Sequence, residues 1–457
     1  MKTIFISISR GLVVRNLLRT DVFEFLRKNT GVKLVFLVLD KAVEEFKKEF
    51  YGNNIEVIPV TSPKTGRFRS LYLKIFARNL VWTDSSKMLT FVGKFSNQKR
   101  EALFYKIIFN TIGFLGKFKI VDRFFRWVEL RIFQEKDFDY LFRGKKTDLM
   151  FLPDIQGKID TALMKSAKRF GVKSVAMTKG WDTLCQRLVR TLPDKLIVQS
   201  EPVREDAIKY QHMPESRIFV SGFPQFDLFL KKEWLLSREE YCKKMGFDPA
   251  RAILFFGSSG AWTNRDSEVV QKICDCVLNN KFARPASLII RPHFSNVIHK
   301  PYKDFYNLPN IYIDDKYTLS NFIDNWNPSD EDNRMLVNTL YHADILVSYL
   351  STLVLDAVVA AKPIINLVFG GQYDLEGKDV TERLFKRTHY QAIVKTGCVR
   401  MAHNLEELIE SVNCYLGNPE LDAGGRQVIK NRWCFGADGG TGERIANFIL
   451  KELGEPM

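Results

Sequence analysis

Short apolar runs alternate with stretches of helical periodicity along most of the chain, and this alternation restricts the possible folds more than any other feature. The first part has apolar runs at residues 3–7, 33–39 and 55–59. Amphipathic stretches separate them, one running to about residue 28 and one over residues 41–50. Strands that alternate with helices in this way pair in parallel, with helices on both faces of the sheet. The sequence therefore predicts an α/β fold with a doubly wound parallel sheet.

The alternation resumes after Asp148 and then occurs a second time. Strands are predicted at residues 149–152, 174–177, 195–199 and 218–221, with helices at 158–170 and 201–210. Further strands are predicted at 252–256, 287–290, 311–313, 345–347 and 363–369, with a polar loop at 325–333, a helix at 404–416 and a last helix at 443–453. Because 457 residues exceed one ordinary core, we expect two Rossmann-like lobes facing a cleft, at residues 1–230 and 231–435.

The charge of the chain favours anionic partners. The formal net charge is +15, with 26% charged and 46% hydrophobic residues, which is typical of a folded protein. No helix-turn-helix, zinc-finger or RNA-recognition motif is present, so we expect no nucleic-acid partner. Residues 62–147 interleave Lys and Arg with Phe. Such a face can lie on an anionic membrane surface or hold an acidic acceptor, although aromatic residues at helical spacing are also typical of ordinary core.

Neither a metal site nor a membrane span is predicted. The seven cysteines and six histidines lack the spacing of disulfide frameworks or metal ligands. No uncharged apolar stretch reaches the roughly 18 residues of a membrane helix, and the apolar run after Met1 is shorter than a signal-peptide core. We expect a cytoplasmic protein, peripheral at the inner face of the cell membrane.

Polar groups follow three predicted strands of the second lobe. Gly257, Ser258, Ser259 and Gly260 follow the first, Arg291 and His293 the second, and Ser348 to Thr352 the third. The carboxyl ends of parallel strands meet at one edge, so a guanidinium, hydroxyls and free N–H groups would converge there. Ser351 or Thr352 is also placed to cap a helix through Ala361. The pattern predicts a diphosphate site, although turns, caps and a surface cation would explain each feature singly.

Several segments carry a family resemblance. Ser351 and Thr352, with Asp356-Ala357 and residues 362–365, resemble the donor-site segment of glycosyltransferases of the GT-B fold. The likeness extends to Trp181-Asp182, to residues 194–198 and 221–227, and to Asp438-Gly439 with Arg444-Ile445. These segments resemble enzymes that build bacterial capsules, lipopolysaccharide and teichoic acids, including CDP-glycerol glycerophosphotransferase-like proteins. The resemblance covers about residues 148–450 and implies a C-terminal helix, within residues 436–457, that crosses back to the first lobe.

The resemblance implies roles for particular residues. The second lobe would bind a nucleotide-sugar donor as substrate, with no cofactor and no metal. The donor-binding candidates are Gly257, Ser258, Ser259, Arg291, His293, Ser348, Ser351, Thr352 and Asp356. Relatives commonly carry Glu where this chain has Asp356, so a solvated helix residue is the alternative there. Asp182 is the predicted base, ahead of Asp154 and Asp160, while Arg291 and His293 support the leaving group. The acceptor-side candidates are Arg10, Gly11, Arg15, Arg387 and His389.

The predicted function is metal-independent transfer of a sugar, or a polyol phosphate, from a nucleotide-activated donor. The acceptor would be a bacterial cell-surface polysaccharide or a lipid-linked glycan. Two alternatives stay open. One is a non-hydrolysing nucleotide-sugar 2-epimerase, although that family's Gly-Thr-Arg-Pro-Glu is absent after the first strand, where residues 7–11 are Ser-Ile-Ser-Arg-Gly. The other is a glycan-binding scaffold without catalytic activity.

Overall fold

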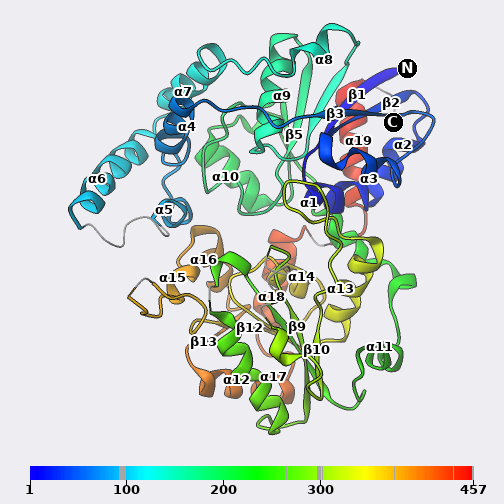
Figure 1. Ribbon diagram of the computed structural model, residues 1–457, viewed down its shortest axis with the longest axis vertical. Coiled ribbons are helices and arrows are strands. Elements are labelled where there is room, and N and C mark those ends of the chain that lie inside the picture. Colours follow the sequence, from blue (N-terminus) through cyan, green and yellow to red (C-terminus); the bar gives the residue numbers. More distant parts are fainter. Residues whose placement is uncertain are drawn as a thin grey trace. The chain divides into compact units, whose positions relative to one another are not determined.

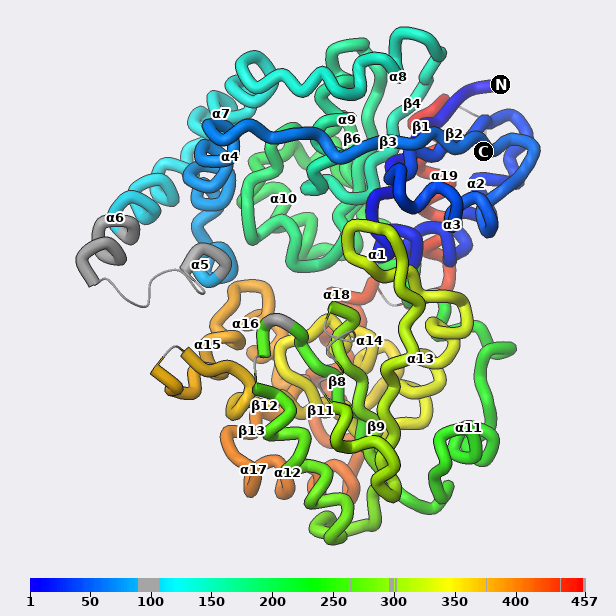
Figure 2. The backbone as a smooth tube through the Cα atoms, viewed as in Figure 1, coloured from blue at the N-terminus to red at the C-terminus, as the bar shows by residue number. Residues whose placement is uncertain are grey.

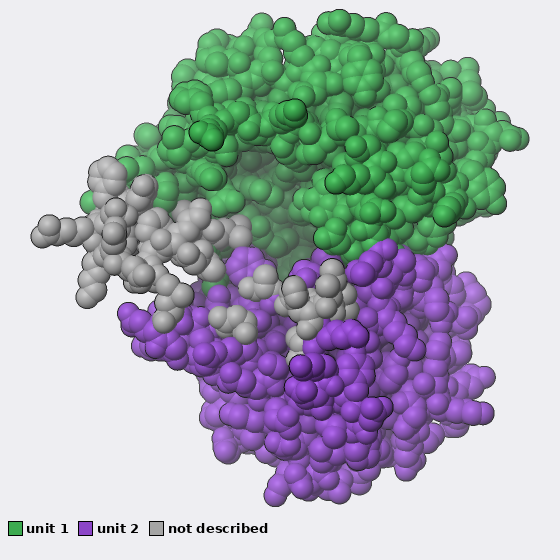
Figure 3. All heavy atoms as spheres, viewed as in Figure 1, with its two compact units in different colours: residues 1–227, 320–327, 437–457 green, residues 228–319, 328–436 purple. Residues whose placement is uncertain are grey.

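Figure 1 shows the computed structural model of the chain, which describes residues 1–91, 99–263, 265–295, 300, 302–374, 376–435 and 437–454, without the side chains of residues 89–91, 99–106 and 261. The chain forms two compact units, coloured separately in Figure 3. The first unit comprises Met1–Asp227, Ser320–Asn327 and Ala437–Met457, and the second comprises Leu228–Leu319 and Pro328–Gly436. Ser320–Asn327 thus belongs to the first unit although it lies far along the chain.

The first unit is built on a sheet of seven strands. Their bounds are Lys2–Ile8 (β1), Val32–Leu39 (β2), Ile55–Val60 (β3), Leu149–Leu152 (β4), Lys173–Met177 (β5), Lys195–Val198 (β6) and Ile218–Val220 (β7). All neighbouring strands are parallel, in the order β3-β2-β1-β4-β5-β6-β7. Strands covered on both faces are apolar along their length, and every residue of β4 is buried. Each strand lies within one residue of its predicted bounds.

Helices cover this sheet. Their bounds are Gly11–Val13 (α1), Asp21–Lys28 (α2), Val43–Lys47 (α3), Lys158–Arg169 (α9), Glu201–Gln211 (α10) and Thr441–Leu453 (α19). The single helix predicted to run to Lys28 is wrong, because the chain breaks at Thr20. The backbone of Thr20 is extended, and its hydroxyl donates to the Leu17 carbonyl at 2.9 Å, so α2 starts afresh at Asp21. Side chains that bond back to the preceding turn compete with helix continuation in this way.

The C-terminal helix α19 packs on α2, as predicted. Figure 2 shows the red C-terminal helix beside the blue α2. The approach is close: a Cβ on Gly442 would lie 2.8 Å from the Cβ of Asp21. The N–H of Gly442 donates to the Asp227 carboxylate at 2.9 Å, and Phe448 stacks on Phe219 with ring centroids 4.3 Å apart. The end of the chain therefore completes the first unit.

The basic and aromatic stretch folds as a set of helices. Their bounds are Arg67–Tyr72 (α4), Leu73–Ala77 (η3, a π-helical turn), Asp84–Phe91 (α5), Lys99–Leu115 (α6), Lys119–Arg131 (α7) and Asp139–Arg143 (α8). Within the described residues, no helix is long and apolar enough to cross a membrane. Part of the stretch is ordinary core, since Phe109, Ile112 and Phe125 are buried together. Other large apolar side chains of α6, α7 and their connection are exposed, namely Ile107, Phe114, Leu115, Phe118, Ile120, Phe124 and Trp127.

Buried charges attach these helices to the sheet. Lys165 on α9 donates to the Glu129 carboxylate of α7 at 2.6 Å, and both side chains are fully buried. Arg69 on α4 donates to the same Glu129 oxygen at 3.2 Å and also to Glu135. Burial raises the pKa of the Glu135 carboxyl, but the hydrogen bond from Arg69 and the charge of Lys165 outweigh this and hold it below its usual value. Three segments therefore share one buried ionic cluster.

Replacing Glu129 with glutamine is expected to destabilise the first unit by about 3–5 kcal/mol, because Lys165 and Arg69 then stay buried without their shared carboxylate. Urea denaturation followed by circular dichroism measures the loss. Glu24→Gln is the matched control, since Glu24 pairs with Arg27 at the surface, where an ion pair contributes about 0–1 kcal/mol. Equal losses in the two variants would show that the buried cluster does not hold these helices.

The second unit is built on six parallel strands. Their bounds are Ala252–Gly257 (β8), Ala286–Arg291 (β9), Ile311–Ile313 (β10), Ile345–Ser348 (β11), Ile364–Leu367 (β12) and Arg400–Ala402 (β13). They lie in the order β10-β9-β8-β11-β12-β13. The first five were predicted; β13 is too short to stand out in the sequence. Two parallel, doubly wound sheets confirm the predicted fold class.

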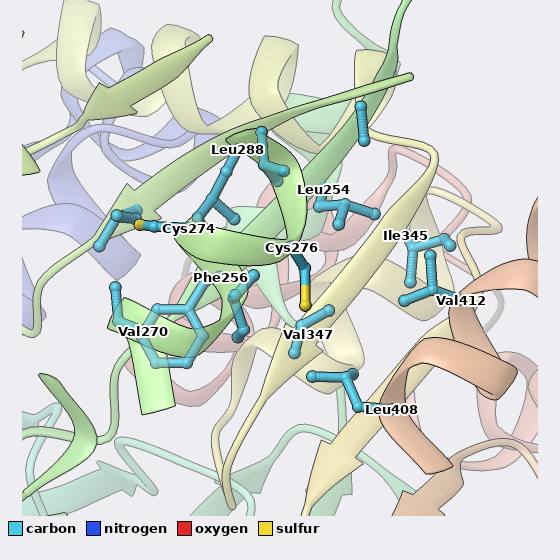
Figure 4. Packing of buried hydrophobic residues seen from close by; sticks show 14 of the residues in the cluster. Leu254, Phe256, Val270, Cys274, Cys276, Leu288, Ile345, Val347, Leu408 and Val412 are labelled. Carbon is cyan, nitrogen blue, oxygen red and sulfur yellow. The ribbon is translucent and has the colours of Figure 1, made fainter. Parts of the chain in front are cut away.

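Helices also cover the second sheet. Their bounds are Arg238–Met245 (α11), Asp266–Leu278 (α12), Asp330–His342 (α13), Leu353–Val359 (α14), Glu382–Phe385 (α15), Thr388–Val394 (α16), Leu405–Gly417 (α17) and Ala423–Trp433 (α18). Figure 4 shows the core, where Cys274 and Cys276 of α12 pack with Leu254 and Val347. The predicted polar loop at 325–333 is wrong at its end, because α13 already begins there. Ser329 caps it, accepting from the Asp332 N–H at 3.1 Å.

Candidate functional site

The carboxyl ends of four strands of the second unit form one row. Gly257 at the end of β8 pairs with Arg291 at the end of β9 on one side and with Ser348 at the end of β11 on the other. Ser348 in turn pairs with Asn366 on β12. The structure therefore brings together the three strand ends singled out in the sequence. It adds Asn366, the one amide in the apolar run of β12.

The two serines after β8 form hydrogen bonds with other groups of the protein. The Ser258 hydroxyl donates to the Asp266 carboxylate at 2.6 Å, at the start of α12, and accepts from the Gly260 N–H at 3.2 Å. The Ser259 hydroxyl donates to the Leu350 carbonyl at 2.7 Å. Both serines are buried. They shape the turn and connect it to the loop after β11, so their predicted contact with a donor stays a prediction.

Arg291 is held by an acidic neighbour. Its Nη1 donates to the Asp314 carboxylate just after β10, and its guanidinium carbon lies 5.2 Å from the ring centroid of Tyr317. Burial lowers the pKa of Arg291, but the carboxylate of Asp314 outweighs burial and raises it overall. The cation is therefore oriented and balanced by the protein, with Asp314 taking one of its five N–H donors.

His293 packs over the turn that follows β8. A Cβ on Gly260 would lie 2.7 Å from the Cγ of His293, and the φ of Gly260 is +61°, so both the contact and the backbone favour glycine. The Nδ1 of His293 accepts the Ser295 N–H at 3.2 Å, a bond that favours the neutral ring. Burial lowers its pKa to about 4. At neutral pH His293 can donate from Nε2, but it carries no charge.

The loop after β11 differs from its prediction. The helix α14 ends at Val359 and not at Ala361, whose φ of +57° lies outside the helical region. Thr352 is the N-cap residue without a side-chain cap bond, and it is exposed. The Ser351 hydroxyl instead accepts the Leu353 N–H at 3.3 Å. Asp356 is only 6% exposed, so the interpretation of it as a solvated helix residue is wrong.

Arg387 and His389 belong to the second unit. Both are buried at the start of α16. The guanidinium carbon of Arg387 lies 3.8 Å from the ring centroid of Trp262, two residues after Gly260. Arg387 thus reaches the turn after β8, a cation–π contact that sequence reasoning missed. Their predicted role toward an acceptor stays a prediction.

A buried amide network crosses the strand ends. The Tyr390 hydroxyl donates to Oδ1 of Asn366 at 2.8 Å. The Asn366 amide then donates to the Ser348 carbonyl at 3.3 Å and lies 3.4 Å from its hydroxyl. Sequence reasoning missed this network as well. The lone polar residue in the apolar run of β12 was the one available signal.

The first unit has its own cluster at the carboxyl edge of the sheet. Asp182, in the loop after β5, is partly exposed and accepts from the Gln186 amide. Arg10, after β1, donates to Asp154, after β4, at 3.0 Å. Asp160 lies close to Asp154, and burial together with that negative charge raises its pKa well above the usual value. A carboxyl that stays protonated is a poor base, which favours Asp182 over Asp160.

Gly11 and Arg15 contact the segment Ser320–Asn327. The N–H of Gly11 donates to the Asp324 carboxylate at 2.8 Å, and a Cβ on Gly11 would lie 1.4 Å from the Trp326 carbonyl oxygen. The guanidinium carbon of Arg15 lies 5.9 Å from the Trp326 ring centroid. Gly11 is therefore needed for this close packing, which is a structural role beside the predicted one.

Comparison with known proteins shows the fold. No protein-family model matches the chain, and no curated protein matches it in sequence. Among solved structures, the UDP-GlcNAc 2-epimerase from Neisseria meningitidis bound to UDP-GlcNAc has a TM-score of 0.56 at 12% identity, covering 99% of this chain and 100% of that one. The S. aureus MnaA structure with UDP has 0.54 at 12%, covering 100% and 99%. The wall teichoic acid polymerase TagF has 0.54 at 10%, covering 99% and 89%. The chain therefore has a GT-B-like fold, as predicted.

The proton affinity of His293 can be tested by NMR. Its ring should titrate with a midpoint near 4, because burial disfavours the imidazolium. An unfolded histidine titrates near 6.5, so the unfolded state takes up the proton first, and stability is lost as the pH falls from about 6.5 through about 4. His293→Gln assigns the signal and should remove this part of the acid sensitivity. A midpoint near 6.5 would show that the ring is solvated.

Proposed function

We propose that the chain is a metal-independent glycosyltransferase of the GT-B type. It transfers a sugar, or a polyol phosphate, from a nucleotide-activated donor to a bacterial surface polysaccharide or a lipid-linked acceptor. The observation that carries the proposal is the row formed by Gly257, Arg291 and Ser348, because ligands of open α/β sheets bind outside the carboxyl ends of the strands. The similar fold of structures that hold UDP or UDP-GlcNAc supports a nucleotide-activated substrate.

The described groups suit a leaving nucleotide diphosphate. Arg291 supplies a guanidinium already oriented by Asp314, and neutral His293 supplies an N–H donor. The exposed hydroxyl of Thr352 adds a further donor. In the proposed reaction Asp182 takes the proton of the acceptor hydroxyl, whose oxygen bonds the transferred carbon or phosphorus as the nucleotide leaves. Fixed donors stabilise the charge that develops on the leaving group.

Nucleotide binding tests the donor site. In a thermal-shift screen against UDP, GDP, dTDP, CDP, CMP and ADP, one nucleotide should raise the melting temperature, because a ligand of the folded state stabilises it. Thr352→Val should weaken that nucleotide by about threefold to tenfold, the range expected for one lost hydrogen bond. Thr396→Val is the matched control, since Thr396 bonds the Ile393 carbonyl and precedes the amino end of β13. No shift with any nucleotide would contradict the proposal.

The role of Asp182 needs a separate measurement on the same preparation. Asp182→Asn should keep the nucleotide-induced shift and lower turnover by about 10²–10⁴-fold, the usual contribution of a general base. Turnover of the selected donor is then followed by chromatography with and without acceptor. Normal turnover in Asp182→Asn would show that another group is the base.

A second candidate function is epimerisation of a nucleotide sugar. The similarity to UDP-GlcNAc 2-epimerases over nearly the whole chain favours it. An epimerase changes UDP-GlcNAc without any acceptor, whereas a transferase needs one to form product, so the acceptor-free arm of the same assay separates them. A scaffold would show no turnover in either arm.

We also propose that α6 and α7 place the enzyme on an anionic membrane. Their exposed apolar side chains include Phe114, Phe124 and Trp127. Exposed cations lie among them, at Lys117, Lys119 and Arg123. Contiguous apolar groups interleaved with Lys and Arg suit an interface whose headgroups are negative and whose interior is apolar. A lipid-linked acceptor would be presented at such an interface.

Vesicle flotation at low salt tests this surface. The protein should float with phosphatidylglycerol vesicles and much less with phosphatidylcholine vesicles, because anionic lipid adds electrostatic attraction. Trp127→Ser should weaken flotation by about tenfold, from the lost burial of one aromatic side chain. Tyr51→Ser is the matched control, since Tyr51 is an exposed aromatic residue between β2 and β3. Equal binding to both lipids would contradict the proposal.

A further inference from the structure

A cavity of about 130 Å³ lies within the first unit, lined by Arg78, Ser86, Gln186 and Arg187. Arg78 follows the π-helical turn η3, Ser86 lies in the first turn of α5, and the other two residues follow β5. The predicted site residues do not include them. The volume is several times the roughly 30 Å³ that a water molecule occupies in the liquid, so the cavity can hold a small polyatomic group.

The lining of the cavity consists mainly of hydrogen-bond donors. Arg187 uses Nε to donate to the Gln156 side chain at 2.9 Å, so this bond does not use its two terminal nitrogens. Within the described part of the chain, the Arg78 side chain has no hydrogen bond or ion pair. The Ser86 hydroxyl accepts from the Thr83 N–H and donates to the Thr83 carbonyl, both at 2.9 Å. None of the described residues that line the cavity carries a carboxylate, so its polar character suits an anion.

The charges around the cavity also favour a bound anion. Burial lowers the pKa of Arg187; the carboxylates of Asp154 and Asp182 raise it, while the cations Arg78 and Arg10 lower it further. Asp154 is already paired with Arg10 at 3.0 Å. Arg187 is thus influenced by two carboxylates and by two further guanidinium groups. A mostly buried cation without full compensation is costly, and a bound anion would remove part of that cost.

We propose that this cavity binds a phosphoryl group of the acceptor, so that the acceptor is a phosphate-carrying glycan or lipid-linked sugar. The proposal rests on the function proposed above. Gln186 provides the connection, because it lines the cavity and its amide donates to the Asp182 carboxylate. A phosphoryl group held by Arg78 and Arg187 would place the rest of the acceptor beside the proposed base. Guanidinium groups suit this task because their forked N–H donors match phosphate oxygens.

Isothermal titration of the full chain with inorganic phosphate tests the cavity. Arg78→Gln is the main variant, because Arg78 has no internal partner whose loss would disturb the fold. It should weaken phosphate binding by about tenfold or more, the range expected for a charge-assisted hydrogen bond. Arg78→Lys should recover part of the affinity. Arg143→Gln is the matched control, since Arg143 is exposed at the end of α8, and it should bind like the wild type. The inference is overturned if Arg78→Gln binds phosphate as the wild type does, or if the wild type binds none.

Two further measurements distinguish this inference from the proposed donor site and the proposed membrane surface. The nucleotide-induced thermal shift should persist in Arg78→Gln, because the donor residues lie in the second unit. A wild type without any nucleotide shift, in which Arg78→Gln still weakens phosphate binding, would remove the proposed function and leave an anion site. Arg78→Gln should also float with phosphatidylglycerol vesicles like the wild type. Loss of flotation would assign the cavity to a lipid headgroup and overturn the acceptor assignment.

Discussion

Parallel strand pairing is the constraint on which the rest of this molecule depends. Every crossover helix returns the chain to the same edge of a sheet, so all loops that follow strands leave from one edge. In the second unit the ladder register then sets Gly257 opposite both Arg291 and Ser348. Gly257 and Ser348 are 91 positions apart in the chain and become neighbours without any direct bond between their side chains. The strand ends are close because the backbone ladder makes them so.

Around this row, several polar side chains bond to other groups of the protein. Ser258 and Ser259 hold the turn after β8, and Asp314 holds the guanidinium of Arg291. Side chains held by such bonds are already oriented, so a ligand at the proposed site would lose less entropy on binding. The protein also fixes the protonation state of His293, because burial lowers its pKa and keeps the ring a neutral donor. The groups that remain available for a ligand are fewer than the sequence motif suggests.

Helix α7 has polar and apolar side chains on both its buried and its exposed side. Its buried residues are Asp122, Phe125, Arg126, Val128 and Glu129, and its exposed residues include Arg123, Phe124 and Trp127. The buried charges are paired within the protein, as Glu129 is with Lys165, and this pairing allows them to lie beside the buried apolar side chains. A helix of a globular protein normally turns its apolar face inward. Core packing therefore accounts for the buried residues of α7 but not for its exposed aromatic residues.

The sequence by itself determined the strands, the order of α/β units and the polar groups at strand ends. These follow from local signals: continuous apolar runs such as residues 149–152, turn residues after them, and helical periodicity such as residues 158–170. The predicted diphosphate site needed only the general rule that parallel strands end at one edge. The structure confirms that the three strand ends lie together, with Gly257, Arg291 and Ser348 in one row, while diphosphate binding there stays a prediction.

Tertiary structure alone decided which polar groups are paired with one another and which are exposed. The contact of Arg387 with Trp262, the bond from Tyr390 to Asn366 and the packing of Gly11 under Trp326 each join distant segments, and no local period encodes them. The cavity beside Arg78 likewise depends on three separate segments. Pairwise contacts of this kind depend on side-chain geometry after the chain has folded. The pattern of residue types therefore predicts the backbone fold, whereas packing decides which side chains contact one another.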